Sequence, residues 1–360
     1  MNFFDAAIAQ ATQITFSGVP HEPATYLNNH SKLKVFKKWF GKWFQLKLHG
    51  QLGLEQQSIP LTAKCLWLYT GKRNFGDANM DLSGRALLKN KATHIDLLTL
   101  PHLQELFEED DIFQNIYSHI DEVQHQHYDF IILSEFNYPS IRLKIKHFKS
   151  IPFVCLFRFF LGPDRNQILF SHFAMNHAFA LNIAHDLIQK SAKPYITHHP
   201  QREEAIQGLL PKEPFIALGL GGIDPDRSYN QWLDFLQLLD QSSHPRLPKT
   251  IVLLGSDNGL KASKCLLEHS FQQLKCIAQV GTLSLLKSRA VICAADIFIG
   301  CDGGLMHLAH STNTPSLTLF AKEPTYLRLT QACKSTPIQG GYNVNVINPQ
   351  LILEKLEKCL

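Results

Sequence analysis

From residue 64 onward, short apolar runs alternate with stretches of helical spacing. The strand-like runs are CLWLYT (65–70), HIDLLTL (94–100), YDFIILS (128–134), IPFVCLF (151–157), FIALGLGG (215–222), TIVLLGS (250–256), IFIGCDGG (297–304) and SLTLF (316–320). The segment MDLSGRALLKN (80–90) between the first two is an example of the helical spacing. Apolar runs this short, separated by amphipathic helices, predict parallel sheets wrapped by helices.

The alternation breaks at 195–214, where YITHHPQREEAIQGLLPKEP is polar and rich in proline. With 360 residues the chain is long enough for two domains, each with its own core. We therefore expect two doubly wound, Rossmann-like domains at 63–205 and 206–345, joined near residue 205, with a cleft between them. Residues 1–62 form an N-terminal extension, and 346–360 a closing helix with Asn348 as N-cap and Pro349 at its first position.

Composition narrows the class of protein. Hydrophobic residues make up 45% and charged residues 18% of the chain, which is typical of a globular protein, and the net charge of +4 gives no reason to expect nucleic acid. The eight cysteines are scattered without a CxxC motif, which favours reduced thiols. The sequence lacks an HxxxH motif with a supporting glutamate, so it does not predict a metal site. Without a signal-peptide pattern or a membrane-spanning apolar run, a cytoplasmic protein is expected.

The segment 31–50, SKLKVFKKWFGKWFQLKLHG, carries six lysines and no acidic residue. On a helix, one side would gather five apolar residues and the other side three lysines: Leu33, Phe36, Phe40, Trp43 and Phe44 against Lys34, Lys38 and Lys42. Two interpretations stay open. Either the helix packs on the first domain with its lysines in water, or residues 31–50 make a peripheral contact with an anionic membrane surface, the inner face of the inner membrane.

The apolar run 297–301 is followed by an acid and two glycines, Asp302, Gly303 and Gly304, and then by a helical pattern. Ligands of open parallel sheets bind beyond the carboxyl ends of the strands, and glycines let the backbone approach a ligand closely. A helix that begins near Leu305 directs its free N–H groups there, which suits a phosphate or diphosphate. Asp302 either accepts hydrogen bonds from sugar hydroxyls or caps the helix.

The segment 294–320, AADIFIGCDGGLMHLAHSTNTPSLTLF, resembles the signature of glycosyltransferase family 9, the ADP-heptose:lipopolysaccharide heptosyltransferases. The residues that fall on the family pattern are Asp302, Gly304, His307, Leu308, Ala309, Thr314 and Pro315. Two further segments of the chain fit the family pattern, in the same order along the sequence. Gly76 and Asp77 occupy a loop after the first strand, and Arg227 and Tyr229 follow the first strand of the second domain.

The resemblance implies a GT-B fold and an inverting transfer that needs no metal and no cofactor. The donor would be a nucleotide-diphosphate sugar, with ADP-heptose as the first candidate. The acceptor would be an anionic inner-core glycolipid of lipopolysaccharide or lipooligosaccharide. The resemblance implies that Asp77 is the general base. It also implies that Arg227 and the backbone of 303–305 bind the diphosphate. His307 would reach the ligand or pack within its helix, and Asp257 is the acid available for the nucleotide ribose.

Basic residues near the expected acceptor side are Arg142, Lys146, Arg158 and Arg165. They form either an acceptor-binding wall or the solvated face of a helix. The chain departs from the family pattern at AKEPT (321–325) and at Gly222-Ile223. Two alternatives to the transferase are therefore kept: a catalytically inactive nucleotide-sugar-binding or assembly protein, and a GT-B nucleotide-sugar epimerase.

Overall fold

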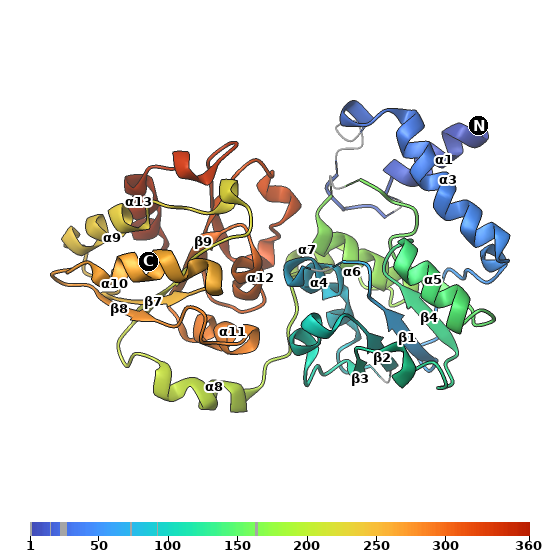
Figure 1. Cartoon of the computed structure of the whole chain (residues 1–360), viewed down its shortest axis with the longest axis horizontal. Coiled ribbons are helices and arrows are strands. Elements are labelled where there is room, and N and C mark those ends of the chain that lie inside the picture. Colours follow the sequence, from blue (N-terminus) through green and yellow to red (C-terminus); the bar gives the residue numbers. More distant parts are fainter. Residues whose placement is uncertain (1, 15, 22–26, 73, 92, 163–164) are drawn as a thin grey trace. The chain divides into compact units, whose positions relative to one another are not determined.

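The computed structural model describes residues 2–14, 16–21, 27–72, 74–91, 93–162 and 165–360 (Figure 1). The chain divides into two compact units. Unit 1 comprises Met1–Thr197 and Tyr326–Thr330, and unit 2 comprises His198–Thr325 and Gln331–Leu360. The junction expected near residue 205 falls inside helix α8 (Pro200–Ile206), which packs against α11 (Leu285–Ala294) of unit 2. The N-terminal extension is part of unit 1, and the closing helix is part of unit 2.

Unit 1 is built on a five-stranded sheet in the order β3-β2-β1-β4-β5. The strands are β1 (Lys64–Leu68), β2 (His94–Leu98), β3 (Phe113–Tyr117), β4 (Phe130–Leu133) and β5 (Phe153–Cys155). Every pairing in it is parallel, with Leu66 opposite Asp96 and Ile131 on its two sides. The central strands β1 and β4 are buried almost throughout, because helices cover both faces of a parallel sheet.

The helices of unit 1 differ in part from the sequence prediction. Those that follow β1 are α4 (Phe75–Asp81), α5 (Tyr138–His147), α6 (Gln167–Ala178) and α7 (His185–Ser191). The expected helix over 80–90 is instead the end of α4 followed by a 3₁₀ helix at Ser83–Leu88. A Cβ on Gly84 would lie 2.3 Å from the carbonyl oxygen of Ser171 on α6. The backbone of this 3₁₀ segment therefore packs directly against α6, at a distance that leaves no room for a side chain at residue 84.

The extension contributes α1 (Phe3–Thr12) and α3 (Lys32–Leu48), which pack against each other in unit 1 (Figure 1). The segment is helical as expected, but Val35, Trp39 and Leu46 are the residues of α3 that enter the core. Phe40 and Phe44, expected on the apolar side, are 38% and 48% exposed. Gly41 in the middle of α3 has a packing reason, since a Cβ there would lie 2.6 Å from the Tyr138 hydroxyl.

Unit 2 is built on a six-stranded parallel sheet in the order β11-β10-β9-β6-β7-β8. Its strands are β6 (Phe215–Gly219), β7 (Thr250–Leu254), β8 (Lys275–Ala278), β9 (Ile297–Cys301), β10 (Ser316–Phe320) and β11 (Ser335–Gln339). Its other helices are α9 (Trp232–Gln241), α10 (Leu260–Glu268), α12 (Gly304–His310) and α13 (Pro349–Cys359).

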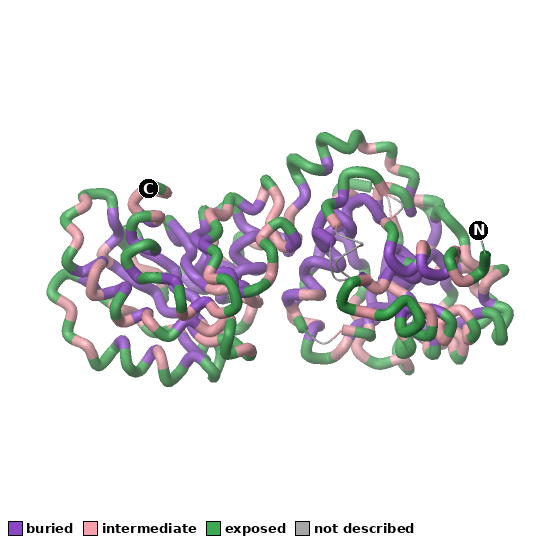
Figure 2. Tube along the Cα trace, turned by 90° about the horizontal axis from the view of Figure 1, so that it is seen from above, coloured by how far each residue is buried: buried purple, intermediate pink, exposed green. Residues whose placement is uncertain are grey.

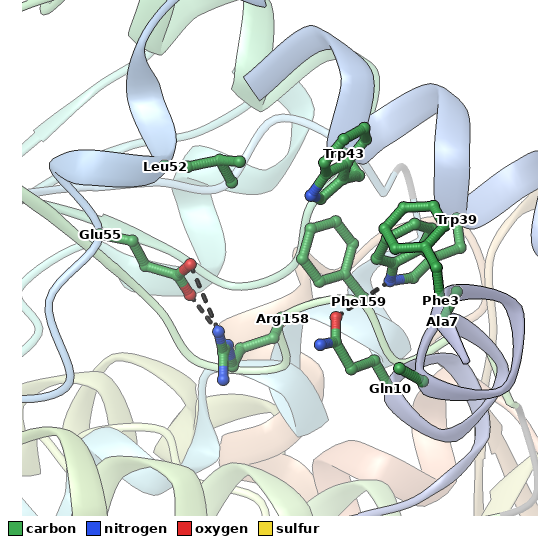
Figure 3. Close-up of a pocket in the computed structure, with 10 residues that line it drawn as sticks. Phe3, Ala7, Gln10, Trp39, Trp43, Leu52, Glu55, Arg158 and Phe159 are labelled. Atoms are coloured by element: carbon green, nitrogen blue, oxygen red, sulfur yellow. Dashed lines mark hydrogen bonds and ion pairs between the residues drawn. The ribbon is translucent and has the colours of Figure 1, made fainter. Parts of the chain in front are cut away.

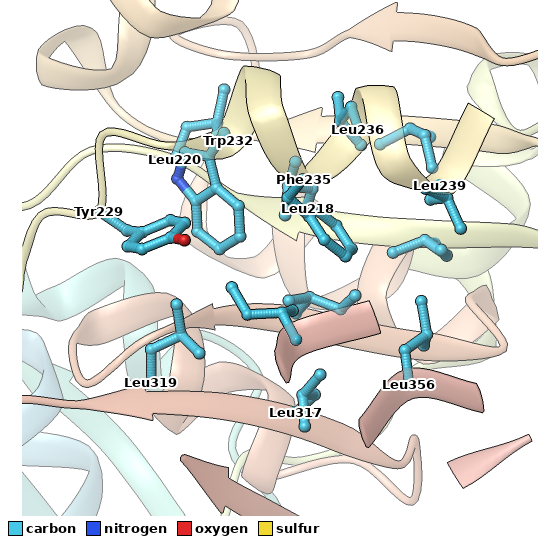
Figure 4. Packing of buried hydrophobic residues seen from close by; sticks show 14 of the residues in the cluster. Leu218, Leu220, Tyr229, Trp232, Phe235, Leu236, Leu239, Leu317, Leu319 and Leu356 are labelled. Carbon is cyan, nitrogen blue, oxygen red and sulfur yellow. The ribbon is translucent and has the colours of Figure 1, made fainter. Parts of the chain in front are cut away.

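Leucines and aromatic residues fill the core between the unit 2 sheet and its helices. Figure 4 shows Trp232 and Phe235 of α9 directed toward the strand β6 that carries Leu218. Asn348 caps α13, because its side chain accepts a hydrogen bond from the Gln350 N–H at 2.9 Å. Helix α13 lies within the segment where the closing helix is expected. Figure 2 shows buried segments inside each unit and exposed ones on its outside.

Both sheets contain a point where the strand order reverses. The chain starts in the middle of each sheet, runs outward to one edge, and then crosses back to the other side of its first strand. The reversal lies between β1 and β4 in unit 1 and between β6 and β9 in unit 2. The predicted fold class, two doubly wound α/β domains, is confirmed, and ligands of such sheets bind beyond the carboxyl ends of the strands at these points.

Candidate active site

In unit 2, the loops that follow β6 and β9 meet at the reversal point through an ion pair. The Arg227 Nη1 lies 3.6 Å from the Asp302 Oδ2, and the Arg227 Nε lies 3.4 Å from Asp224. The Asp302 side chain is 2% exposed, whereas that of Arg227 is 36% exposed. A buried carboxylate therefore anchors a guanidinium that still reaches solvent at the edge where a ligand is expected.

A glycine brings the loop after β6 into direct contact with the loop after β7. Gly221, after β6, has a φ of +81°, which L side chains rarely adopt. A Cβ at this position would lie 2.4 Å from the Asn258 Oδ1 and 2.9 Å from the Gly259 nitrogen, in the loop after β7. Asp257, the residue expected to meet the ribose, is exposed in this second loop. The loop containing Asp257 is therefore adjacent to the glycine loop of β6.

The third loop of this edge leads from β9 into α12. Gly303 is the N-cap, with extended backbone, and the helix begins at Gly304, one residue earlier than expected. A Cβ on Gly303 would meet only the Cys301 carbonyl, at 3.8 Å, so the space beside this backbone is open. The first amides of α12 have no acceptor within the helix, which makes them suitable donors to an anion.

His307 lies one turn into α12 and is buried, with 4% of its surface exposed. Its ring is 6.4 Å from that of His310, and burial together with His307 lowers the pKa of His310 to about 3. His310 is therefore neutral at physiological pH. His307 is thus a buried side chain of α12.

In unit 1, the reversal point is crowded with charged side chains. Asp77 is half-buried in the first turn of α4, and Asp81 is buried at the end of the same helix. Asp81 accepts a hydrogen bond from the Tyr69 hydroxyl at 2.9 Å and another from the Gln167 amide, and the Lys72 Nζ lies 2.7 Å from it. Asp81 is thus fully engaged, while Asp77 takes part in no ion pair with any other described residue.

The electrostatics of unit 1 link Asp77 to this group. Burial alone would lower the pKa of Lys72, but the carboxylates of Asp81, Glu135 and Asp77 together raise it. Burial lowers the pKa of Arg165, and the same three carboxylates oppose that shift. Lys72 and Arg165 therefore lie in the same electrostatic environment as Asp77.

The sequence and fold were compared with known proteins. Residues 165–339, just under half of the chain, match the model of glycosyltransferase family 9 (heptosyltransferase), and the match includes Arg227 and Asp302. The resemblance to family 9 is confirmed. The expected enzyme class, a glycosyltransferase, is supported by the same match. A search of curated proteins finds no match to the chain.

Solved structures share the fold. The family 9 glycosyltransferase of Veillonella parvula aligns over 84% of this chain and 98% of its own, with 14% identity and a TM-score of 0.66. The Escherichia coli ADP-heptose lipopolysaccharide heptosyltransferase II aligns over 82% and 98%, with 18% identity and a TM-score of 0.62. The E. coli heptosyltransferase WaaC, solved with ADP, aligns over 82% and 100%, with 14% identity and a TM-score of 0.62. At these identities the likeness shows the fold alone, two parallel-sheet α/β domains.

The four basic residues expected at the acceptor lie in three different surroundings. Arg165 is buried, with its guanidinium 4.9 Å and 5.0 Å from the ring centres of Phe160 and Phe170, and it shares the electrostatic environment of Asp77. Arg142 and Lys146 are exposed on α5, and Lys146 is in its last turn, whereas the Asp77 group lies where that helix begins. The structure therefore groups Arg165 with Asp77 and does not place Lys146 there.

Arg158 lines a pocket of about 200 Å³ in unit 1 (Figure 3). Its Nε donates a hydrogen bond to Glu55 at 2.8 Å, and its φ of +46° is unusual for a non-glycine residue. The remaining lining residues come largely from α1 and α3 of the extension: Phe3, Ala6, Ala7, Gln10, Trp39, Trp43, Leu52 and Phe159. The Trp39 indole donates to the Gln10 side chain at 3.1 Å. Arg158 is thus held by an ion pair at an aromatic wall.

Lys72, Asp81 and Glu135 were not singled out from the sequence. Lys72 and Glu135 lie in the segments that follow β1 and β4, so their positions after apolar runs could have indicated the site, but the proximity of one to the other depends on the strand order. Among the described residues, no group of three or more His, Cys, Asp or Glu side chains is arranged to hold a metal ion. No helix in the described part of the chain is long and apolar enough to cross a membrane.

Proposed function

We propose that this chain transfers a heptose, or a related sugar, from a nucleotide-diphosphate donor to an inner-core acceptor of lipopolysaccharide or lipooligosaccharide. ADP-heptose is the preferred donor. The observation that carries the proposal is the Arg227–Asp302 pair at the strand-order reversal of unit 2, beside a glycine loop and a helix N-terminus. The fold is shared with the heptosyltransferase WaaC, which has been solved with ADP and with ADP-2-deoxy-2-fluoro heptose.

The donor would bind to the carboxyl edge of the unit 2 sheet. The amides of Gly303, Gly304 and Leu305 and the guanidinium of Arg227 would hold the diphosphate, because both provide positive potential without an ion. The Asp302 Oδ2 is buried and accepts no hydrogen bond from any described residue, so it could accept one from a sugar hydroxyl. Asp257, in the loop beside Gly221, is the candidate for the nucleotide ribose.

The acceptor hydroxyl would lose its proton to Asp77 of unit 1. In an inverting displacement, the hydroxyl oxygen attacks the anomeric carbon, the proton passes to the base, and the bond from that carbon to the diphosphate oxygen breaks. The charge that develops on the leaving diphosphate would be stabilised by Arg227 and the α12 amides. Lys72 and Arg165 share the electrostatic environment of Asp77, and their positive charge would suit an anionic acceptor.

Acceptor selectivity would come from unit 1. Arg165, next to the Asp77 group, and Arg158, at the aromatic pocket, are the basic residues best placed by their surroundings. Arg142 and Lys146 would contribute at most through the general charge of the exposed face of α5. Inner-core acceptors carry negative groups, so a basic unit 1 fits their chemistry.

Two measurements test the proposal in sequence. First, thermal unfolding is followed with ADP, UDP and GDP; a ligand at one hundred times its Kd stabilises by about 2.7 kcal/mol, and ADP should stabilise most. Second, ADP-heptose and a heptose-deficient inner-core acceptor are incubated with the protein, and the glycosylated acceptor is detected by mass spectrometry. No stabilisation by any nucleotide would contradict the donor assignment. Stabilisation without transfer would support the inactive nucleotide-sugar-binding alternative.

A further inference from the structure

Large exposed hydrophobic side chains of unit 1 gather on the N-terminal extension. Phe3 of α1 is 51% exposed, and α3 adds Leu33 at 57%, Phe40 at 38%, Phe44 at 48% and Leu48 at 66%. Single exposed apolar residues are common on protein surfaces, but a contiguous group marks a contact with another apolar phase. We call these five residues the outer face of the extension.

The outer face is separate from the face by which α3 joins the core. With about 100° of rotation per residue, Leu33, Phe40, Phe44 and Leu48 form one stripe along α3. The buried residues Val35, Trp39 and Leu46 form a second stripe, roughly 150° away around the helix. The core therefore uses one apolar face of α3 and leaves the other directed toward solvent.

Ring contacts hold the outer face in a fixed arrangement. Phe40 stacks on Phe36 at 5.7 Å and on Phe44 at 5.9 Å between ring centres. Phe3 contacts Trp39 and Trp43 edge-on, at 5.4 Å and 5.3 Å. The exposed aromatic surface is thus formed before any partner binds, so little conformational entropy is lost when it is covered.

The charge along α3 has one sign. The exposed lysines of α3 are Lys32, Lys34, Lys37, Lys38 and Lys47. No acidic residue occurs between Leu27 and Leu54. Lys47 also lies 4.7 Å from the Trp43 ring centre, so its ammonium group is held beside the aromatic rings.

We infer that the outer face of the extension docks on the surface of an anionic lipid bilayer. Aromatic and aliphatic side chains enter the boundary between headgroups and acyl chains, while flanking lysines contact the acidic headgroups. A protein partner would need acidic groups in the same pattern, whereas a bilayer presents apolar and anionic groups together over any area. The inference goes beyond the proposed reaction and does not depend on the donor or the acceptor.

The test is cosedimentation of the full chain with vesicles of phosphatidylcholine alone and of phosphatidylcholine with phosphatidylglycerol. We expect binding to the phosphatidylglycerol vesicles, weakened by salt, and little binding to the neutral ones. The double variant Lys37→Gln/Lys47→Gln should lower the partition coefficient roughly 30-fold, since each basic residue near an anionic surface contributes about a fivefold factor. The double variant Phe40→Ser/Phe44→Ser should lower it at least tenfold.

A matched control is available in unit 2. Leu260 and Leu267 of α10 are 49% and 48% exposed, and Leu260→Ser/Leu267→Ser should bind vesicles like the wild type. Thermal unfolding checks that each variant is folded, and transfer to a soluble acceptor should be unchanged in Phe40→Ser/Phe44→Ser, which separates docking from catalysis. Absence of wild-type binding to anionic vesicles, or unchanged binding by the phenylalanine variant, would overturn the inference. So would a lipid-free dimer that the phenylalanine variant abolishes, because the face would then belong to a second copy of the chain.

Discussion

The reversal points of the two sheets share one topology and differ in chemistry. In unit 1, Lys72, Asp77, Asp81, Glu135 and Arg165 interact electrostatically at the ends of β1 and β4. In unit 2, the corresponding edge is lined by glycines and by one ion pair, from Arg227 to Asp302. The strand order sets where a ligand is expected in each unit, and the side chains that follow the strands decide which chemistry that edge suits.

The difference has a physical basis. A diphosphate is bound well by amides and a guanidinium, and glycines expose the amides because they have no Cβ. Proton transfer instead needs a side chain that can change its charge, supported by neighbours of opposite sign. The glycine-lined edge therefore suits donor binding, and the charged edge suits the acceptor and its proton.

The largest effect that would test this division is expected from Asp77→Asn. Losing the base should lower kcat by roughly 10² to 10⁴, because general base catalysis contributes that factor, while the affinity for ADP stays within about twofold. Steady-state transfer and calorimetric ADP binding measure the two quantities. The control Asp121→Asn alters an exposed carboxylate in a surface turn of unit 1 and should keep full activity. Full activity of Asp77→Asn would remove Asp77 from the mechanism.

The next effect concerns the glycine-lined edge itself. Gly221→Ala should weaken ADP binding at least tenfold and destabilise unit 2 by about 2 to 3 kcal/mol, since it adds a steric clash with the β7 loop to a strained φ. Gly341→Ala is the matched control, because Gly341 has a φ of +72° with nothing within 4 Å of a Cβ. It should cost about 1 kcal/mol and leave ADP affinity unchanged. Equal effects of the two substitutions on ADP binding would contradict a special role for the 219–222 loop.

A smaller effect is expected at the ion pair. Arg227→Gln should weaken ADP binding about tenfold, in line with the loss of one charge-assisted hydrogen bond, and should leave Asp302 buried without its cation. The same substitution should reduce the salt dependence of ADP binding. Arg246→Gln, at an exposed arginine that precedes β7, is the control and should bind ADP as the wild type does. If both variants bind alike, Arg227 is not a phosphate ligand.

The smallest expected effect concerns the pH dependence of stability. It comes from a lysine that is buried in unit 1 away from the charged residues around Asp77. Lys144 on α5 is fully buried, and its Nζ donates to the Gln51 side chain at 2.7 Å and to the Phe148 carbonyl at 2.9 Å. Burial lowers the pKa of Lys144 to about 8, whereas an unfolded lysine titrates near 10.4. Between these values the unfolded chain binds more protons than the folded one, so the contribution of Lys144 to stability rises with pH.

Lys144→Met removes this titration. The unfolding free energy of the wild type relative to the variant should increase by about 1 to 2 kcal/mol between pH 7.5 and pH 9.5. Chemical unfolding at both pH values measures the difference, and transfer activity of the folded variant should be unaffected. A difference that is flat with pH would show that the Lys144 charge is not desolvated.

The central strands and the buried edge strand β5 could be predicted from the sequence, and the other three edge strands could not. The strands β1, β4, β6, β7, β9 and β10 are apolar along most of their length, and each was expected. The strands β3, β8 and β11, with the sequences FQNIY, KCIA and STPIQ, were missed. All three lie at a sheet edge, where one side meets solvent and the apolar run disappears.

The site shows the same limit. Asp302, Arg227 and Asp77 could be named from motifs because each follows a predicted strand. Glu135 could not be grouped with Asp77, since β1 and β4 become neighbours only through the strand order of the folded sheet. On α3 the periodicity indicates apolar residues on more than one side, and only the tertiary contacts decide that Val35, Trp39 and Leu46 enter the core.

The most direct test of the division between the two edges is hydrogen exchange of the full chain with and without saturating ADP. Binding of the diphosphate to unit 2 predicts slower exchange of the backbone amides in residues 220–228 and 302–306, with residues 69–81 of unit 1 unchanged. Protection of residues 69–81 without protection of 302–306 would contradict the account.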